Sequence, residues 1–422
     1  MRIRFTNGYI CSMAEVPTLI AAELWTHDDR ISYVGAPCAD TPVFDRTVDL
    51  GGNLLLPGFK NAHTHSAMTF LRSRADDMPL LTWLESCVFP LEARLTPDQA
   101  YIFNKLAIME YLTSGITAAM DMYFYPEAMA RAAVDTGFRA VLVGSVNNHT
   151  GSADAMVYDF QRFNQYHELI SAVMGFHAEY TCSEELLRKV ADLSAWHGAP
   201  VFAHNSESAA ETADCLRRTG LTPTAYLDSL GLFACGGGGY HCVHLTDADM
   251  DIFRQRGLAV ITNPAANSKL ASGIAPVCQI LEKGIPVALG TDGPAGNNAL
   301  DMFREMFMVT ALQKITQNDA AALNAEEVLT MALSTGADVM GLPDCNSLAP
   351  GKQADLTVID LAQPNMQPIN NSLHNIVYAG SKQNVKLTMV RGKILYEDGV
   401  FHIGADPQDI YRQANAALAE LL

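Results

Sequence analysis

Short apolar runs alternate with longer amphipathic stretches through the middle of the chain. Between the runs lie stretches with helical spacing, such as PDQAYIFNKLAIMEYLTSG and SEELLRKVADLSAWHG, and the second opens on Ser183 as a cap and closes on Gly198. The apolar runs, in order, are NLLLPGF, GITAAMDM, FRAVLVGS, ISAVMGFHAEY, APVFAHNS, GGYHCVHL, GLAVITNP and IPVALGTDG. Eight strands that alternate with helices predict an α/β fold, a (β/α)8 TIM barrel, rather than an open doubly wound sheet.

Both ends of the chain instead show the two-residue alternation of short strands. The N-terminal examples are RIRFTNGYI, RISYVGA and TVDLGG, and the C-terminal ones are QADLTVID and VKLTMVRGKILYEDG, which predicts a hairpin that turns at Gly392. We expect the two ends to pair. The predicted organisation is a small β-sandwich domain from residues 1–53 and 350–405, a barrel over 54–349 and a C-terminal helix over 406–422.

Composition narrows the function classes. The chain has 422 residues, of which 49% are hydrophobic and 18% charged, and its formal net charge is −18. Nucleic acid binding needs a basic surface, so this balance argues against it. Nine cysteines without a CxxC pair indicate reduced thiols rather than a disulfide framework. No stretch reaches about 18 apolar residues, so we expect a cytoplasmic protein that does not bind membranes.

Polar residues recur where the apolar runs end. His63 and His65 follow the first run, His204 the fifth, His241 the sixth and Asp292 the eighth. In a barrel these ends share one rim, so we expect the side chains to converge.

His63 and His65 are two residues apart, so both imidazoles point the same way from an extended chain. Alone, this pair also fits two hydrogen-bonded histidines at a strand end. His204 and Asp292 raise the number of ligands to four, which favours a catalytic metal site. Glu207, three residues after His204, fits a proton shuttle beside a metal-activated water, or else a solvated loop residue.

The chain resembles the amidohydrolase superfamily, in the branch of mononuclear-metal aminohydrolases. The stretches PGFKNAHTH, PVFAHNSE, HCVH, LGTDG and GKQADLTVID occur in the family's order. Within that branch it is most similar to S-adenosylhomocysteine/5′-methylthioadenosine deaminases, on HTHSAMTFLR, PLEARLT, CSEELL, HCVHL and LGTDGPAGNN. The resemblance implies a hydrolytic deaminase of an adenine nucleoside, and a homo-oligomer.

The resemblance also implies roles for residues. His63, His65, His204 and Asp292 would bind one divalent metal ion, zinc most often, with Fe²⁺ or Mn²⁺ as alternatives. Asp292 would also accept the proton of the attacking water, Glu207 would shuttle protons, and His241 would orient that water. Glu92 matches a glutamate that binds ribose hydroxyls, and His177 matches a histidine that contacts the purine. Since the fourth run ends in His177 and carries no lysine, we expect a mononuclear site.

Two departures from the family's pattern bear on the substrate. The stretch VGSVNNHTGSADAM has none of the arginines that reach the carboxylate of S-adenosylhomocysteine, and Gly296 replaces the family's serine. Both favour a smaller nucleoside, namely 5′-methylthioadenosine, adenosine or 5′-deoxyadenosine, unless Arg72, Arg74 or Arg162 compensates. The alternatives are a hydrolase of a guanine-, pterin- or triazine-type heterocycle and a catalytically silent binding barrel.

Overall fold

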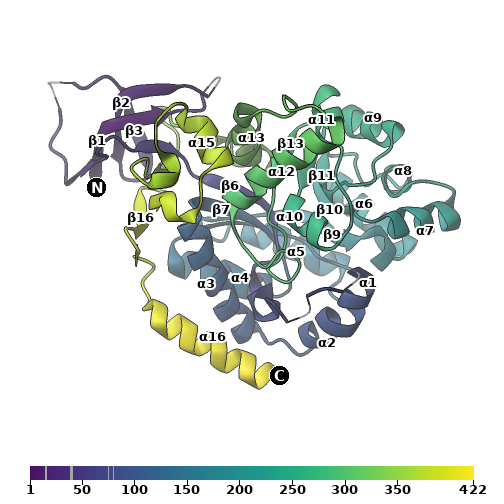
Figure 1. Cartoon of the computed structure of the whole chain (residues 1–422). Helices are drawn as coiled ribbons and strands as arrows, with labels where there is room; N and C mark the ends of the chain where they lie inside the picture. The colour runs from purple at the N-terminus through teal and green to yellow at the C-terminus, as the bar shows by residue number, and fades with distance from the viewer. Residues whose placement is uncertain (15–16, 39–40, 75, 79) are drawn as a thin grey trace.

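Eight parallel strands form a barrel at the centre of the molecule (Figure 1). The computed structural model describes residues 1–14, 17–38, 41–74, 76–78 and 80–422. The barrel strands are β6 (Phe59–Thr64), β7 (Ile116–Met122), β8 (Arg139–Val143), β9 (Ile170–Ala178), β10 (Val201–Asn205), β11 (Gly237–His241), β12 (Leu258–Thr262) and β13 (Val287–Leu289). The predicted (β/α)8 barrel is therefore confirmed.

The first and last barrel strands meet through the segment that follows β13. The backbone N–H of Thr291 donates to the carbonyl of His63 at 3.1 Å, and the amide of Asn61 donates to the Thr291 hydroxyl at 2.8 Å. This contact closes the ring and brings the loop after β13 against the end of β6.

Helices surround the barrel and return the chain from each strand to the next. Ser183 caps the helix after β9 by accepting from the N–H of Leu186 at 3.3 Å, and Gly198 ends it with φ of 62°, as predicted. The helices of this layer include α3 (Pro97–Thr113), α4 (Pro126–Thr136), α5 (Ala153–Phe163), α6 (Glu184–His197), α7 (Ala209–Thr219), α8 (Pro223–Ser229), α9 (Asp247–Arg256), α10 (Pro264–Lys269), α11 (Val277–Glu282), α12 (Met302–Gln317), α13 (Ala325–Ala332) and α14 (Ser334–Val339).

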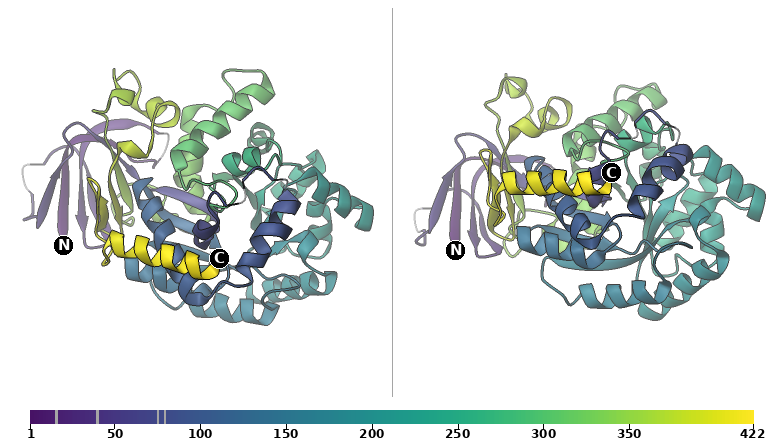
Figure 2. Two further views of the ribbon diagram at one scale, coloured as in Figure 1. Left: turned by 60° about the horizontal axis from the view of Figure 1, so that its bottom comes forward. Right: turned by 90° about the horizontal axis from the view of Figure 1, so that it is seen from below.

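Both ends of the chain contribute to one further sheet beside the barrel (Figure 2). Its strand order joins N-terminal to C-terminal strands through an antiparallel pair of β14 and β5. The predicted hairpin around Gly392 is confirmed as the antiparallel pair of β15 and β16. Its strands are β1 (Arg2–Cys11), β2 (Leu19–His27), β3 (Arg30–Gly35), β4 (Arg46–Asp49), β5 (Leu54–Pro57), β14 (Leu356–Ile359), β15 (Val385–Val390), β16 (Lys393–Glu397) and β17 (Val400–Phe401).

Gly58 separates β5 of the terminal sheet from β6 of the barrel. A Cβ at this position would lie 2.0 Å from Cγ2 of Thr117, so only glycine lets the two sheets approach here. The apolar run NLLLPGF thus divides between two sheets. The division of the chain into domains stays a prediction.

A buried ion pair joins the barrel to the terminal sheet. Arg139, at the start of β8, donates to both carboxylate oxygens of Asp355, beside β14, at 2.8 and 3.2 Å. The N–H of Arg391 donates to the same carboxylate at 2.7 Å. The remaining helices are α15 (Ser372–Tyr378) and α16 (Pro407–Leu421), which lies along α3 (Figure 2).

Candidate active site

Five side chains predicted from strand ends meet at the C-terminal end of the barrel. His63 and His65 lie at the end of the barrel strand β6, His204 lies on β10, and His241 ends β11. Asp292 lies in the loop after β13, and all five side chains are buried. The shared rim of the parallel strands therefore gathers residues that lie more than 200 positions apart.

The metal-binding atoms of these side chains lie close to one another. The Nε2 atoms of His63 and His65 lie 3.6 and 3.3 Å from Oδ1 of Asp292. The candidate ligand atoms of these three residues all lie within 4.8 Å of one another, and so do those of His63, His204 and His241. Zinc binds imidazole and carboxylate ligands at about 2.0–2.2 Å, so one ion can bridge atoms spaced in this way.

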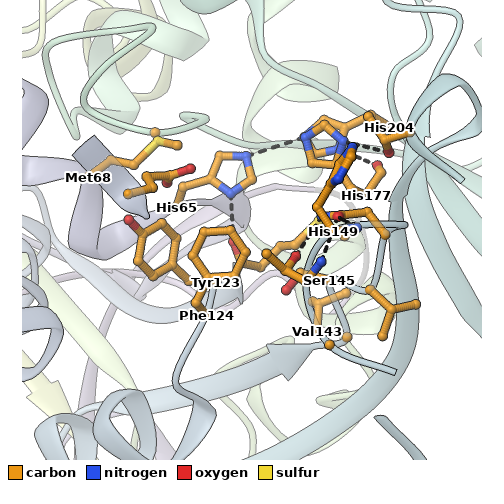
Figure 3. A pocket seen from close by; sticks show the side chains of 18 of the residues that line it. His65, Met68, Tyr123, Phe124, Val143, Ser145, His149, His177 and His204 are labelled. Carbon is orange, nitrogen blue, oxygen red and sulfur yellow. Dashed lines mark hydrogen bonds between the residues drawn. The ribbon is translucent and has the colours of Figure 1, made fainter. Parts of the chain in front are cut away.

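Hydrogen bonds to backbone carbonyls fix which ring nitrogens face the centre. Nδ1 of His65 donates to the carbonyl of Met122, and Nδ1 of His204 donates to that of His177, both at 2.6 Å (Figure 3). The two Nε2 lone pairs then face each other at 3.3 Å, which is repulsive without a cation between them. Both ring nitrogens of the buried His63 also lack a hydrogen-bond partner. These residues fit a divalent metal ion.

The protonation states suit metal binding. Burial lowers the pKa of His63 to about 3 and moves the pKa of His204 well below its usual value. Burial opposes ionisation of Asp292, but the adjacent histidines, His63 first, lower its pKa. Burial also opposes ionisation of His241, yet the carboxylates of Glu207 and Asp292 raise its pKa. Neutral imidazoles and an ionised carboxylate are the forms that bind divalent metals.

Glu207 faces this group from the loop after β10. Its Oε1 atom accepts from the hydroxyl of Ser272 at 3.4 Å and lies 3.9 Å from Nδ1 of His241. Burial raises the pKa of this carboxyl, which favours a group that can carry a proton. Glu211 accepts instead from the backbone N–H groups of Ser206 and Glu207 at 3.0 and 2.8 Å, so it holds the loop.

Asn267 orients His241, and the sequence analysis missed it. Its Oδ1 accepts from Nδ1 of His241 at 2.7 Å. The helix that carries it, α10, is anchored because the N–H of Ala265 donates to Glu305 at 3.0 Å, and Glu305 also accepts from Asn297 at 2.6 Å. The asparagine-rich stretch NPAANS after the seventh apolar run was the available signal.

Three residues of this site adopt left-handed backbone conformations. The φ angles are 52° at Ser206, 67° at His241 and 58° at Asp292. Such conformations cost of the order of 1–3 kcal/mol each for residues other than glycine, and they persist only where the surroundings enforce them. Their concentration at one rim indicates that the fold holds this geometry against a local cost.

A cavity of about 1040 Å³ opens above these residues. Glu92, on the short helix α2 (Phe89–Glu92), and His177, on β9, both line it. The Oε1 atom of Glu92 has no hydrogen-bond partner, and burial raises the pKa of this carboxyl to about 8. Tyr123 also lines the cavity, and its hydroxyl interacts with the Glu92 carboxyl. Glu92 and Tyr123 thus form a buried polar pair at the cavity wall.

No lysine or arginine occurs among the described residues that line this cavity. Arg72 is paired with Glu110, and Arg162 is paired with Glu127 at 3.0 Å. Arg74 is exposed and does not line the cavity either. None of the three arginines therefore supplies a cationic group to the described lining of this cavity.

Comparison with known proteins places the chain. The model of the amidohydrolase family matches residues 54–395. The chain belongs to this family. It is 42% identical over 363 residues to a 5-methylthioadenosine/S-adenosylhomocysteine deaminase of Nitratidesulfovibrio vulgaris, covering 84% of this chain and 82% of that one. It is 38% identical over 402 residues to a 5′-deoxyadenosine deaminase of Methanothermobacter thermautotrophicus, covering 93% of each.

A solved structure is also similar to this chain over nearly its whole length. A zinc-bound adenosine deaminase of Xanthomonas campestris superposes with a TM-score of 0.94 at 31% identity, covering 99% of this chain and 98% of that one. The resemblance found from the sequence motifs is confirmed by these comparisons, and so is the barrel.

Proposed function

We propose that the protein is a metal-dependent hydrolytic deaminase of an adenine nucleoside, which it converts to the inosine analogue and ammonia. The observation that carries the proposal is the group of facing Nε2 lone pairs and the Asp292 carboxylate beside the buried Glu207. The names of the relatives, which act on 5′-methylthioadenosine, S-adenosylhomocysteine, 5′-deoxyadenosine and adenosine, supply the substrate class.

His63, His65, His204 and Asp292 would hold one divalent ion, for which the zinc-bound relative favours Zn²⁺. Such an ion, when bound, lowers the pKa of a water molecule towards about 7 and so supplies a nucleophile at neutral pH. We further propose that the site is mononuclear, because β9 ends in His177 rather than in a lysine that could bridge two ions.

Different side chains around the four candidate metal ligands carry out the different proton transfers. Asp292 accepts the proton of the attacking water, because its carboxylate is ionised and lies at the centre of the group. Glu207 gives a proton to the ring nitrogen beside the carbon that bears the amino group, and a later proton goes to the departing amine. His241, held by Asn267, orients the water. The C–N bond breaks, a C–O bond forms and ammonia leaves.

The cavity lining suggests how the nucleoside lies. Glu92 would bind the ribose hydroxyls through its carboxyl group, and His177 would contact the purine next to the ligand His204. The absence of lysine and arginine from the described lining favours 5′-methylthioadenosine, adenosine or 5′-deoxyadenosine over S-adenosylhomocysteine. A bare guanine, pterin or triazine would leave Glu92 without a ribose to bind, so these substrates are the weaker alternative.

An ammonia-release screen tests this assignment. The protein, loaded with Zn²⁺, Fe²⁺ or Mn²⁺, is assayed with the adenine nucleosides, guanine, pterins and triazines. Glu207→Gln should keep the metal and lose activity by orders of magnitude, whereas Glu85→Gln, at an exposed position of the same cavity, should change it little. A preference for a free base over every nucleoside would overturn the substrate assignment. Near-normal turnover by Glu207→Gln would overturn the role of that residue.

The cellular location and the oligomeric state of the protein are also proposals. No helix among the described residues has the length and apolar character needed to cross a membrane. No disulfide bond joins cysteines among the described residues, which supports a reducing compartment such as the cytoplasm. We also propose a homo-oligomer, which sedimentation of the purified protein would test.

A further inference from the structure

Part of the cavity is lined by residues of β8, β9 and α5, and we call this part the apolar arm. Val143 faces the barrel interior, whereas its neighbour Leu142 belongs to the core between the sheet and the helices, and both line the cavity. The cavity therefore leaves the barrel mouth at the end of β8. The apolar arm is lined by Leu142, Val143, Met156, Phe160, Phe163 and Ala172.

Its walls are largely buried side chains. Phe163 is fully buried and Met156 is 4% exposed, and both belong to the cavity lining. Gly144 lets α5 lie close to the strand, because a Cβ there would come within 2.7 Å of Cγ of Met156. Figure 3 shows Val143 and Ser145 at the far side of the pocket from His65.

The total volume exceeds what a base and a ribose need. At about 1040 Å³ the cavity lies at the upper end of the range of roughly 300–1,000 Å³ that drug-sized ligands occupy. With the purine at the histidines and the ribose at Glu92, space remains along the arm, and also along Trp83, Leu84, Val88 and Phe89.

Charge in the arm excludes an anionic ligand end. Asp159, on α5, is the charged side chain among the described residues that line this part of the cavity. Arg162, one turn further on, pairs with Glu127 of α4 and does not line the cavity. A carboxylate placed here would meet a carboxylate and apolar side chains, and burial of an unpaired charge is costly.

We propose that the apolar arm binds the 5′ substituent of the nucleoside and selects uncharged thioethers that extend beyond a methylthio group. The inference rests on the proposed function, which places the nucleoside. Each buried methylene raises the affinity about fourfold, because its transfer from water to an apolar site is favourable. Three additional methylenes, from 5′-methylthioadenosine to 5′-butylthioadenosine, should raise kcat/KM of the order of 50-fold, up to the diffusion limit.

Steady-state kinetics of the metal-loaded protein tests the proposal with adenosine, 5′-methylthioadenosine, 5′-butylthioadenosine and S-adenosylhomocysteine. We expect the butylthio compound to have the highest kcat/KM and S-adenosylhomocysteine the lowest of the thioethers. Phe160→Ala should lower kcat/KM for the butylthio compound about tenfold and leave that for adenosine within twofold. Tyr158→Ala, on the same helix but 61% exposed and outside the cavity lining, is the matched control and should change neither.

Two outcomes would overturn the proposal: equal kcat/KM for the methylthio and butylthio compounds, or a preference for S-adenosylhomocysteine. Failure of the proposed function looks different, since no adenine nucleoside would then release ammonia. Calorimetric binding to Glu207→Gln separates the two, because it measures the affinity gained from the butyl chain without turnover. Equal affinity for adenosine and 5′-butylthioadenosine there would also reject the arm.

Discussion

Replacement of Arg139 by alanine would test the ion pair that joins the barrel to the terminal sheet. Arg139 and Asp355 are 6% and 1% exposed, and the guanidinium donates two hydrogen bonds to the carboxylate. The variant leaves the Asp355 charge buried without its guanidinium partner, although the N–H of Arg391 still donates to it and Cys345 and Lys60 lie nearby. Removal of one partner from a buried ion pair costs about 3–5 kcal/mol, so we expect a loss of that size in the free energy of unfolding.

Urea unfolding followed by tryptophan fluorescence would measure this loss. Arg188→Ala is the matched control, because Arg188 forms an exposed pair with Glu184 one helical turn away. Such pairs contribute about 0.3–0.5 kcal/mol. The double variant Arg139→Met with Asp355→Leu should recover much of the stability, since it removes the unpaired charge as well. If Arg139→Ala were no more destabilising than Arg188→Ala, the reasoning would be refuted.

The same ion pair predicts a pH dependence. Burial opposes ionisation of Asp355, but Arg139 lowers its pKa below the value of 3.8 that the unfolded chain would have. A carboxyl with a lowered pKa in the folded state stabilises the fold above its unfolded pKa. That contribution is lost as the pH falls through the folded pKa. The difference in the free energy of unfolding between the wild type and Arg139→Ala should therefore become smaller at acid pH.

Three further changes give measurable results. Asn267→Ala should lower kcat about 10- to 100-fold with little change in KM. Asn267→Asp keeps the oxygen that accepts from His241, so it should restore part of the lost kcat. A change in KM alone would contradict the orienting role. Chelation of the metal should stop ammonia release and lower the unfolding temperature. The lost binding free energy is about 4 kcal/mol where the ion is at 1,000 times its Kd. Unchanged calorimetric scans would argue against a bound ion. Burial raises the pKa of Glu92 in the folded state to about 8. As the pH rises from 4.5 to 8, the free energy of unfolding of the wild type should therefore fall relative to that of Glu92→Gln. Urea titrations at several pH values would show or disprove this fall.

The barrel and the strand-end residues were predictable from sequence because each depends on a local pattern. His204 and Asp292 directly follow apolar runs, and parallel strands bring such positions to one rim whatever their distance along the chain. The break at Gly58 was not predictable in this way, because the clash that requires glycine comes from Thr117, 59 positions away. Asn267 was missed for the same reason, since its contact with His241 spans 26 residues.

The apolar arm lay beyond sequence reasoning for a different reason. Met156, Phe160 and Phe163 follow the ordinary spacing of a helix that packs on a sheet, so their pattern predicts core. Whether such side chains fill the space beneath a helix or leave a chamber depends on how far the helix stands from the strands. That distance is set by packing throughout the layer rather than by any local motif.

The acceptors that fix the rings of His65 and His204 are the backbone carbonyls of Met122 and His177. A carbonyl oxygen is present whatever side chain its residue bears. Substitutions at positions 122 and 177, which line the cavity, can therefore alter ligand preference while the rings keep their orientation and tautomer. The backbone groups that hold the ligand rings are thus distinct from the side chains that contact a substrate. New substrates can therefore be acquired by changing residues of the cavity wall one at a time. Divergent relatives of this chain should accordingly vary along the cavity wall and share one arrangement of ligand rings.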